Sequence, residues 1–254
     1  MLLPHDDDGT GTPVVLLHGL TATRRYVVMG SKALQRSGHR VVAYDARGHG
    51  EAPPGDRYDY EALAGDLLEL LDELGLDAPV LAGASMGGHT LLRFALAHPE
   101  RARALVVITP AYDPDAFPSG LRRWDALSEG LRAGGVEGFL EAYGDPPVPE
   151  SYRDTVRTVL RQRISRHRRP EAVADALRDV PRSRPFDSWA DLRSLRAPVT
   201  VVASRDDADP EHPLAIGERY AAEIPGARLV VEEPGKSPLA WQGGQLSKII
   251  AEAA

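Results

Sequence analysis

The sequence has 254 residues, of which 43% are hydrophobic, and a formal net charge of −7. This length and apolar content suffice for one sizeable hydrophobic core, so we expect one domain that carries an insertion. The acidic balance provides no basic footprint for nucleic acid. The absence of cysteine excludes disulfides, thiolate metal sites and a cysteine nucleophile.

The first residues contain neither a basic segment nor a long apolar run, so we expect no signal peptide. No apolar run reaches the length that spans a membrane. We therefore expect a cytoplasmic protein that acts on a small-molecule substrate, without nucleic-acid or membrane partners. The sequence indicates no oligomeric state.

Short apolar runs alternate with amphipathic stretches along most of the chain, which predicts an α/β fold with a mostly parallel sheet flanked by helices. The runs are rich in β-branched residues and almost continuously apolar, as in strands buried on both faces. The predicted strands are residues 14–17, 40–45, 80–82, 104–108, 199–203 and 228–231. The predicted helices are residues 60–74, 86–98, 214–224 and 245–253.

Residues 111–190 interrupt this alternation. They contain proline, glycine and arginine clusters and helical stretches such as 124–133 and 151–166, without a convincing strand. An insertion at this point, between two strands, predicts a helical cap over the top of the sheet. We accordingly expect a core formed by residues 1–110 and 191–254.

The segment around Ser85 carries the strongest chemical signal. Gly83-Ala84-Ser85-Met86-Gly87 fits G-x-S-x-G, and it directly follows a strand pattern and precedes a helix pattern. A nucleophile on such a strand-to-helix turn needs small residues two positions away on each side, which the two glycines supply. The sequence predicts Ser85 as a nucleophile.

With His18-Gly19 after the first clear strand and Asp45-Ala46-Arg47-Gly48-His49-Gly50 after the second, the chain resembles the α/β-hydrolase fold superfamily. The resemblance implies an oxyanion hole formed by the backbone N–H groups of Leu20 and Met86. It also implies structural rather than catalytic roles for His18, Asp45, Arg47 and His49.

The same resemblance places the catalytic acid in the loop after residues 199–203. A proline four residues further along favours Asp206, whereas counting back from residues 224–226 favours Asp207. We take Asp206 as the acid and keep Asp207 as the alternative.

The position of the usual catalytic histidine is occupied by Lys236, within the segment Pro-Gly-Lys-Ser-Pro at 234–238. A lysine is a cation at neutral pH, and a neighbouring carboxylate stabilises that cation. We therefore expect an Asp206–Lys236 ion pair beside Ser85. None of the other histidines falls at this position, and His212, six residues after Asp206, is kept as an alternative acid or base.

Together with the resemblance, these residues predict a hydrolase of small ester-like substrates in which Ser85 is the nucleophile, Asp206 the acid and Lys236 an atypical or impaired base. The alternatives are a non-hydrolytic enzyme of the lyase or oxygenase type on the same scaffold, and an inactive ligand-binding homologue. No metal-ligand constellation or phosphate-binding glycine loop stands out, so we expect neither a cofactor nor a metal.

Overall fold

The computed structural model describes residues 2–205 and 209–254. Within them a seven-stranded sheet has the order β1-β3-β2-β4-β5-β6-β7, in which β1 is antiparallel to β3 and all other neighbours are parallel. The strands are β1 (His5–Asp8), β2 (Thr12–Leu17), β3 (His39–Tyr44), β4 (Val80–Ala84), β5 (Ala104–Ile108), β6 (Val199–Ala203) and β7 (Arg228–Val231). The predicted α/β class and mostly parallel sheet are confirmed.

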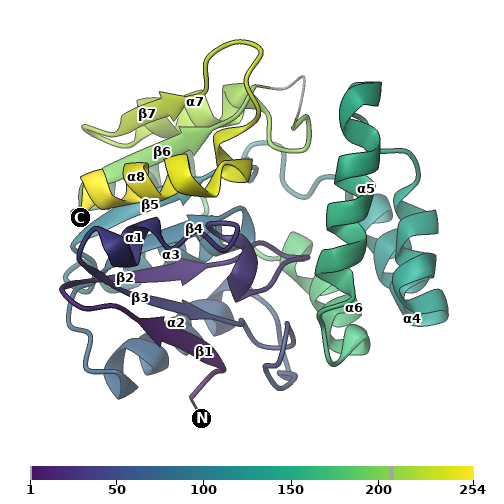
Figure 1. Ribbon diagram of the computed structural model, residues 1–254, viewed down its shortest axis with the longest axis horizontal. Coiled ribbons are helices and arrows are strands. Elements are labelled where there is room, and N and C mark those ends of the chain that lie inside the picture. The colour runs from purple at the N-terminus through teal and green to yellow at the C-terminus, as the bar shows by residue number, and fades with distance from the viewer. Residues whose placement is uncertain (1, 206–208) are drawn as a thin grey trace.

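Helices cover both faces of this sheet (Figure 1). One hydrophobic cluster joins the sheet to α1 and α8, and a second joins its other face to α2, α3 and α7. These helices are α1 (Ala33–Arg36), α2 (Tyr60–Glu73), α3 (Met86–Ala97), α7 (Leu214–Glu223) and α8 (Gly243–Ala253), with single 3-10 turns η1 (Arg24–Tyr26) and η4 (Leu239–Trp241).

The central strands form because their residues suit burial on both faces. All five residues of β5 are buried, and β4 pairs with β2 and β5 through Leu17↔Gly83 and Ala84↔Ile108. The carboxyl ends of β2, β4 and β5 therefore meet at one edge of the sheet. In folds of this class ligands bind at that edge.

Residues 111–190 are described in full and contain helices but no strand. Three helices, α4 (Leu121–Tyr143), α5 (Glu150–Ile164) and α6 (Pro170–Asp179), form a group at one side of the sheet (Figure 1), and the 3-10 turns η2 (Val180–Arg182) and η3 (Trp189–Ser194) return the chain to β6. Gly135, with φ of 59° and ψ of −139°, divides α4 into two arms. The division into a core and a cap stays a prediction.

The helical group is tied to the core by polar contacts as well as by packing. His167, just after α5, accepts a hydrogen bond from the Gly50 N–H (2.9 Å) and lies 3.3 Å from the Thr21 carbonyl oxygen. Ser183 Oγ accepts from the N–H of Tyr60 at 2.9 Å. Separately, no helix in the described part of the chain combines the length and apolarity needed to cross a bilayer.

Candidate active site

Ser85 lies between the end of β4 and the first residue of α3, as the G-x-S-x-G pattern predicts. Its backbone has φ of 48° and ψ of −114°, a conformation that non-glycine residues rarely adopt and that costs about 1–3 kcal/mol. The Ser85 N–H donates to the Ile108 carbonyl at 2.9 Å, which fixes the turn against β5. The side chain is partly exposed. The turn thus presents the hydroxyl at the carboxyl edge of the sheet.

Two glycines permit this turn, and a third lies in the loop beside it. A Cβ on Gly83 would overlap the Gly87 backbone, and a Cβ on Gly87 would overlap the Leu17 carbonyl. A Cβ on Gly19 would stand 3.7 Å from the Cβ of Ser85. The loop after β2 therefore lies directly against the serine.

Two backbone N–H groups in the segments next to Ser85 have no hydrogen-bond partner among the described residues. The N–H groups of Leu20 and Met86 donate to no other residue that the structure describes, and both residues are buried. Met86 is the first residue of α3, whose N-terminal amides favour negative charge. This arrangement suits an oxyanion beside Ser85.

Four buried histidines near this edge already use both ring nitrogens. His18 contacts the Gly19 carbonyl and accepts from the Ala46 N–H. His49 contacts the carbonyls of Arg47 and Leu20. His89 contacts the Tyr60 hydroxyl and accepts from the N–H groups of Ala111 and Tyr112, and His167 is bound as described above. These rings hold loops in place and have no nitrogen left for a substrate.

Burial keeps these rings neutral. Loss of solvation is the main cause that lowers the pKa of His18, His89 and His167 to about 3. It also lowers the pKa of His49. The structural roles that the resemblance implies for His18 and His49 agree with these contacts. Arg47 likewise pairs with Asp66 at 2.6 Å, and Asp45 accepts from the Arg24 N–H at 2.9 Å.

His212 differs from these four. Its Nδ1 lies 2.9 Å from Asp209 Oδ1, and its Nε2 makes no hydrogen bond to a described residue. Burial alone lowers the pKa of His212, but the charge of Asp209 and the hydrogen bond to it outweigh burial, so the net shift of the pKa is upward. An imidazole with Nδ1 held by a carboxylate and Nε2 free is the arrangement of a general base.

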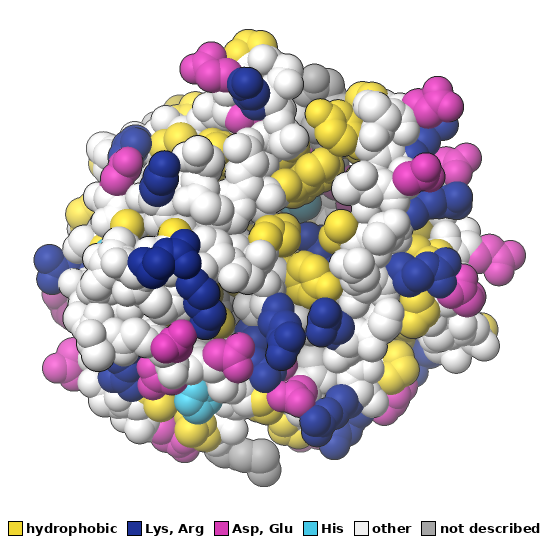
Figure 2. All heavy atoms as spheres, viewed as in Figure 1, with side chains coloured by type: hydrophobic (Ala, Val, Ile, Leu, Met, Phe, Trp, Pro, Cys, Tyr) yellow, Lys and Arg dark blue, Asp and Glu magenta, His cyan; other side chains and the backbone are white. Residues whose placement is uncertain are grey.

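His212 interacts electrostatically with the helix that follows the serine turn. His212 helps to lower the pKa of His89, after burial, and His89 lies one helical turn beyond Ser85. Arg163 of α5 acts electrostatically on both His18 and His212. Figure 2 shows a hollow between the core and the α4–α6 group, with hydrophobic side chains around its mouth and histidine and basic side chains inside.

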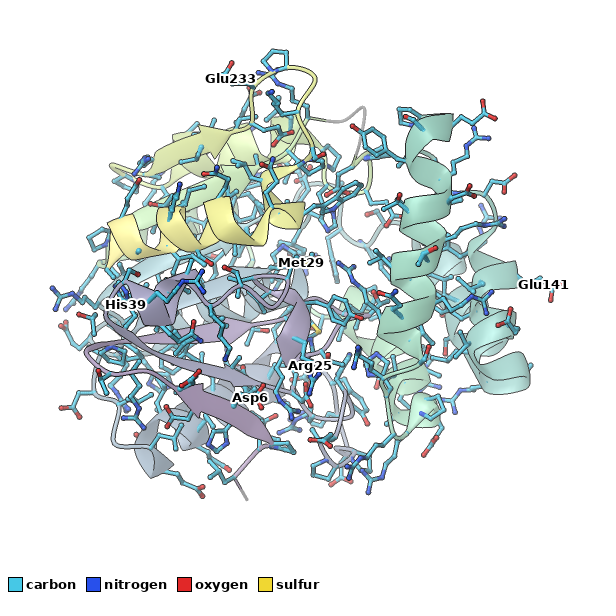
Figure 3. The ribbon with its side chains drawn as sticks, in the orientation of Figure 1. Asp6, Arg25, Met29, His39, Glu141 and Glu233 are labelled. Carbon is cyan, nitrogen blue, oxygen red and sulfur yellow. The ribbon has the colours of Figure 1, made fainter. Side chains whose placement is uncertain are left out.

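Lys236 lies in an exposed turn after β7, closed by a hydrogen bond from its N–H to the Glu233 carbonyl at 3.1 Å. Glu233, in the same turn, points outward at the top of the molecule (Figure 3). Lys236 makes no ion pair with a residue between 2 and 205 or between 209 and 254. Asp206 and Asp207 lie outside the described residues, so the predicted Asp206–Lys236 ion pair stays a prediction.

Sequence reasoning missed Asp209 as a partner for His212. The signal was present as an acid three residues before a histidine, in the loop where the acid was expected. Buried Glu232 was also missed: it accepts from the Arg205 N–H at 2.6 Å and so ties the start of this loop to the end of β7. The described residues contain no group of three or more metal-ligating side chains.

Comparison with known proteins places this geometry in context. The sequence model of the α/β hydrolase fold family matches residues 12–242. A thermophilic esterase from Thermogutta terrifontis, whose structure is solved, is 31% identical, with a TM-score of 0.79, over 98% of this chain and 92% of that one. The non-heme chloroperoxidase CPO-A1 of Kitasatospora aureofaciens is 29% identical over 96% of this chain and 91% of its own.

A further relative has a higher sequence identity than these two, but over a shorter segment. The sn-1-specific diacylglycerol lipase ABHD11 of Mus musculus is 43% identical over 104 residues, which are 41% of this chain. The match spans only 34% of the length of that lipase.

Proposed function

Because the chain belongs to the α/β hydrolase fold family, we propose that it hydrolyses small ester-like substrates with Ser85 as the nucleophile. In this proposal His212 is the general base and Asp209 orients its ring. The N–H groups of Leu20 and Met86 bind the oxyanion. The similar esterase and lipase support the hydrolytic reaction.

The proposed reaction runs in two halves. Ser85 Oγ attacks the ester carbonyl carbon while Nε2 of His212 takes the hydroxyl proton, and the carbonyl oxygen becomes an oxyanion. Collapse of this intermediate breaks the bond to the alcohol, which leaves with the proton from His212. Water, deprotonated by His212, then attacks the acyl-serine. The bond to Ser85 Oγ breaks, His212 returns the proton to that oxygen, and the acid leaves.

The burial and pairing of the two basic groups favour His212 over Lys236 as the base. A solvated ammonium has no lone pair to accept a proton near neutral pH. The Lys236 side chain is exposed, whereas His212 is partly buried and bound to Asp209. Asp209 thereby takes the role that the sequence assigned to Asp206 or Asp207.

One observation carries the proposal: a partly exposed serine in a strained turn with free N–H donors on two sides. We expect the purified protein to hydrolyse p-nitrophenyl acetate, and Ser85→Ala to lower kcat/KM by about 10³-fold or more, because the variant has no nucleophile. Release of p-nitrophenol at pH 8 measures this. If Ser85→Ala retains the rate, Ser85 is not the nucleophile. If the intact protein has no activity, a lyase-like or ligand-binding role replaces hydrolysis.

A further inference from the structure

The side chain of Arg163 lacks an acid partner among the residues that the structure describes. It projects from the last turn of α5, and its guanidinium stacks over the Tyr26 ring with 5.3 Å from Cζ to the ring centroid. Its Nε atom is buried and has no hydrogen-bond partner. Burial, the main cause, lowers the pKa of this guanidinium, which shows how much solvation it has lost.

The carboxylates that act on Arg163 are already engaged. Asp209 binds His212, and Glu211 pairs with Arg123 and accepts from the Tyr143 hydroxyl at 3.0 Å. Arg163 makes no ion pair closer than 4.0 Å with any acid that the structure describes. The guanidinium therefore has no acid partner of its own among the described residues.

Arg163 also belongs to the site by position. Tyr26, which it stacks on, lies in the loop that follows β2 and that passes Ser85 at Gly19. Its charge acts on His18 in that loop and on His212 across the hollow. Four residues after Arg163, His167 contacts the Thr21 carbonyl at 3.3 Å, so the end of α5 that carries Arg163 lies against the oxyanion loop.

A guanidinium that has lost solvation without gaining an acid partner is costly, and an anion that binds it offsets that cost. We propose that Arg163 binds the carboxylate of an anionic ester, so that the substrate is the monoester of a dicarboxylic acid. The planar fork matches the two oxygens of a carboxylate. Asp209 and Glu211 nearby disfavour a doubly charged phosphate. This inference rests on the proposed hydrolysis at Ser85.

Monomethyl glutarate and dimethyl glutarate test the inference, since they share a skeleton and differ in one negative charge. We expect Arg163→Met to lower kcat/KM for the monoester by about 10- to 100-fold, the loss of a charge-assisted hydrogen bond, and for the diester by less than about threefold. Arg163→Lys retains the charge but not the planar fork, so we expect its kcat/KM for the monoester to lie between those of the intact protein and Arg163→Met. A pH-stat measures both esters.

Arg166 supplies the matched control. It lies near the same ring, with Nε donating to the Tyr26 hydroxyl at 3.2 Å, but its side chain is exposed. Arg166→Met leaves the ratio of the two rates unchanged. Equal losses on both esters in Arg163→Met and Arg163→Lys, with melting temperatures like that of the intact protein, would overturn the inference.

Binding of free glutarate separates this inference from the hydrolytic proposal. We expect calorimetry to show glutarate binding to the intact protein and at least tenfold weaker binding to Arg163→Met. If neither ester is turned over, the hydrolytic proposal fails, whereas a loss of glutarate binding still supports the carboxylate site. If glutarate does not bind, or binds both proteins equally, Arg163 is no carboxylate site.

Discussion

Replacement of His212 by alanine lowers kcat/KM for p-nitrophenyl acetate by about 10³-fold or more, because the serine loses its proton acceptor. Lys236→Ala, at an exposed turn, changes the same constant by less than about threefold. Steady-state rates of the two variants at pH 8 give the comparison. A large loss in Lys236→Ala with an active His212→Ala would make the lysine the working base.

The pH dependence of kcat/KM for the intact protein tests independently whether His212 is the base. The base acts only when neutral, so kcat/KM rises with pH through the pKa of His212 and levels off above it. Because Asp209 raises that pKa from its ordinary value of 6.5, the half-rise lies above pH 6.5. Asp209→Asn removes the cause and moves the half-rise to lower pH. Lys236→Ala leaves it in place.

The free energy of unfolding falls steeply between pH 7 and pH 5. Burial lowers the pKa of His18, His89 and His167 to about 3 in the folded protein, against 6.5 as the ordinary value. Between these values the unfolded chain binds more protons, so stability is present above pH 6.5 and is lost as the pH falls toward 3. Each ring costs about 2 kcal/mol at pH 5, or about 6 kcal/mol for the three.

Urea titrations at half-unit intervals of pH measure this loss through the unfolding midpoint and its slope. His167→Gln, which cannot titrate, removes about a third of the pH dependence, since one of three comparable groups is gone. His212 acts in the opposite sense, because its raised pKa favours the folded state at acid pH. Unfolding free energies that stay level from pH 7 to pH 5 would contradict the burial of neutral rings.

The sequence predicted the parts of the fold that depend on local patterns. The runs that became β4 and β5 are continuously apolar, and the serine turn between β4 and α3 has glycines where the backbones touch. The edge strand β1 and the short helix α1 were missed, because β1 is the acidic run His-Asp-Asp-Asp and α1 is a single turn. Neither segment has the periodic spacing of apolar residues from which strands and helices are predicted.

The site was harder to predict, because its charges come together only through tertiary contacts. The pairing of Asp209 with His212 is local, but its relation to His89 and Arg163 depends on how α5 packs beside the core. Motif spacing indicated Lys236 as the residue at the position of the catalytic histidine. That its side chain is exposed could be learned only from the folded chain. Arg163 is one of many arginines in its stretch of sequence, and only its unmade hydrogen bond distinguishes it.

Activation of Ser85 by an imidazole can be measured without a known substrate. A fluorophosphonate reacts only with an activated serine, and mass spectrometry of the digested protein locates the label. We expect stoichiometric labelling of Ser85 at pH 8 in the intact protein and in Lys236→Ala, and labelling at least 100-fold slower in His212→Ala. An intact protein that stays unlabelled, or equal rates with and without His212, would contradict an imidazole-activated Ser85.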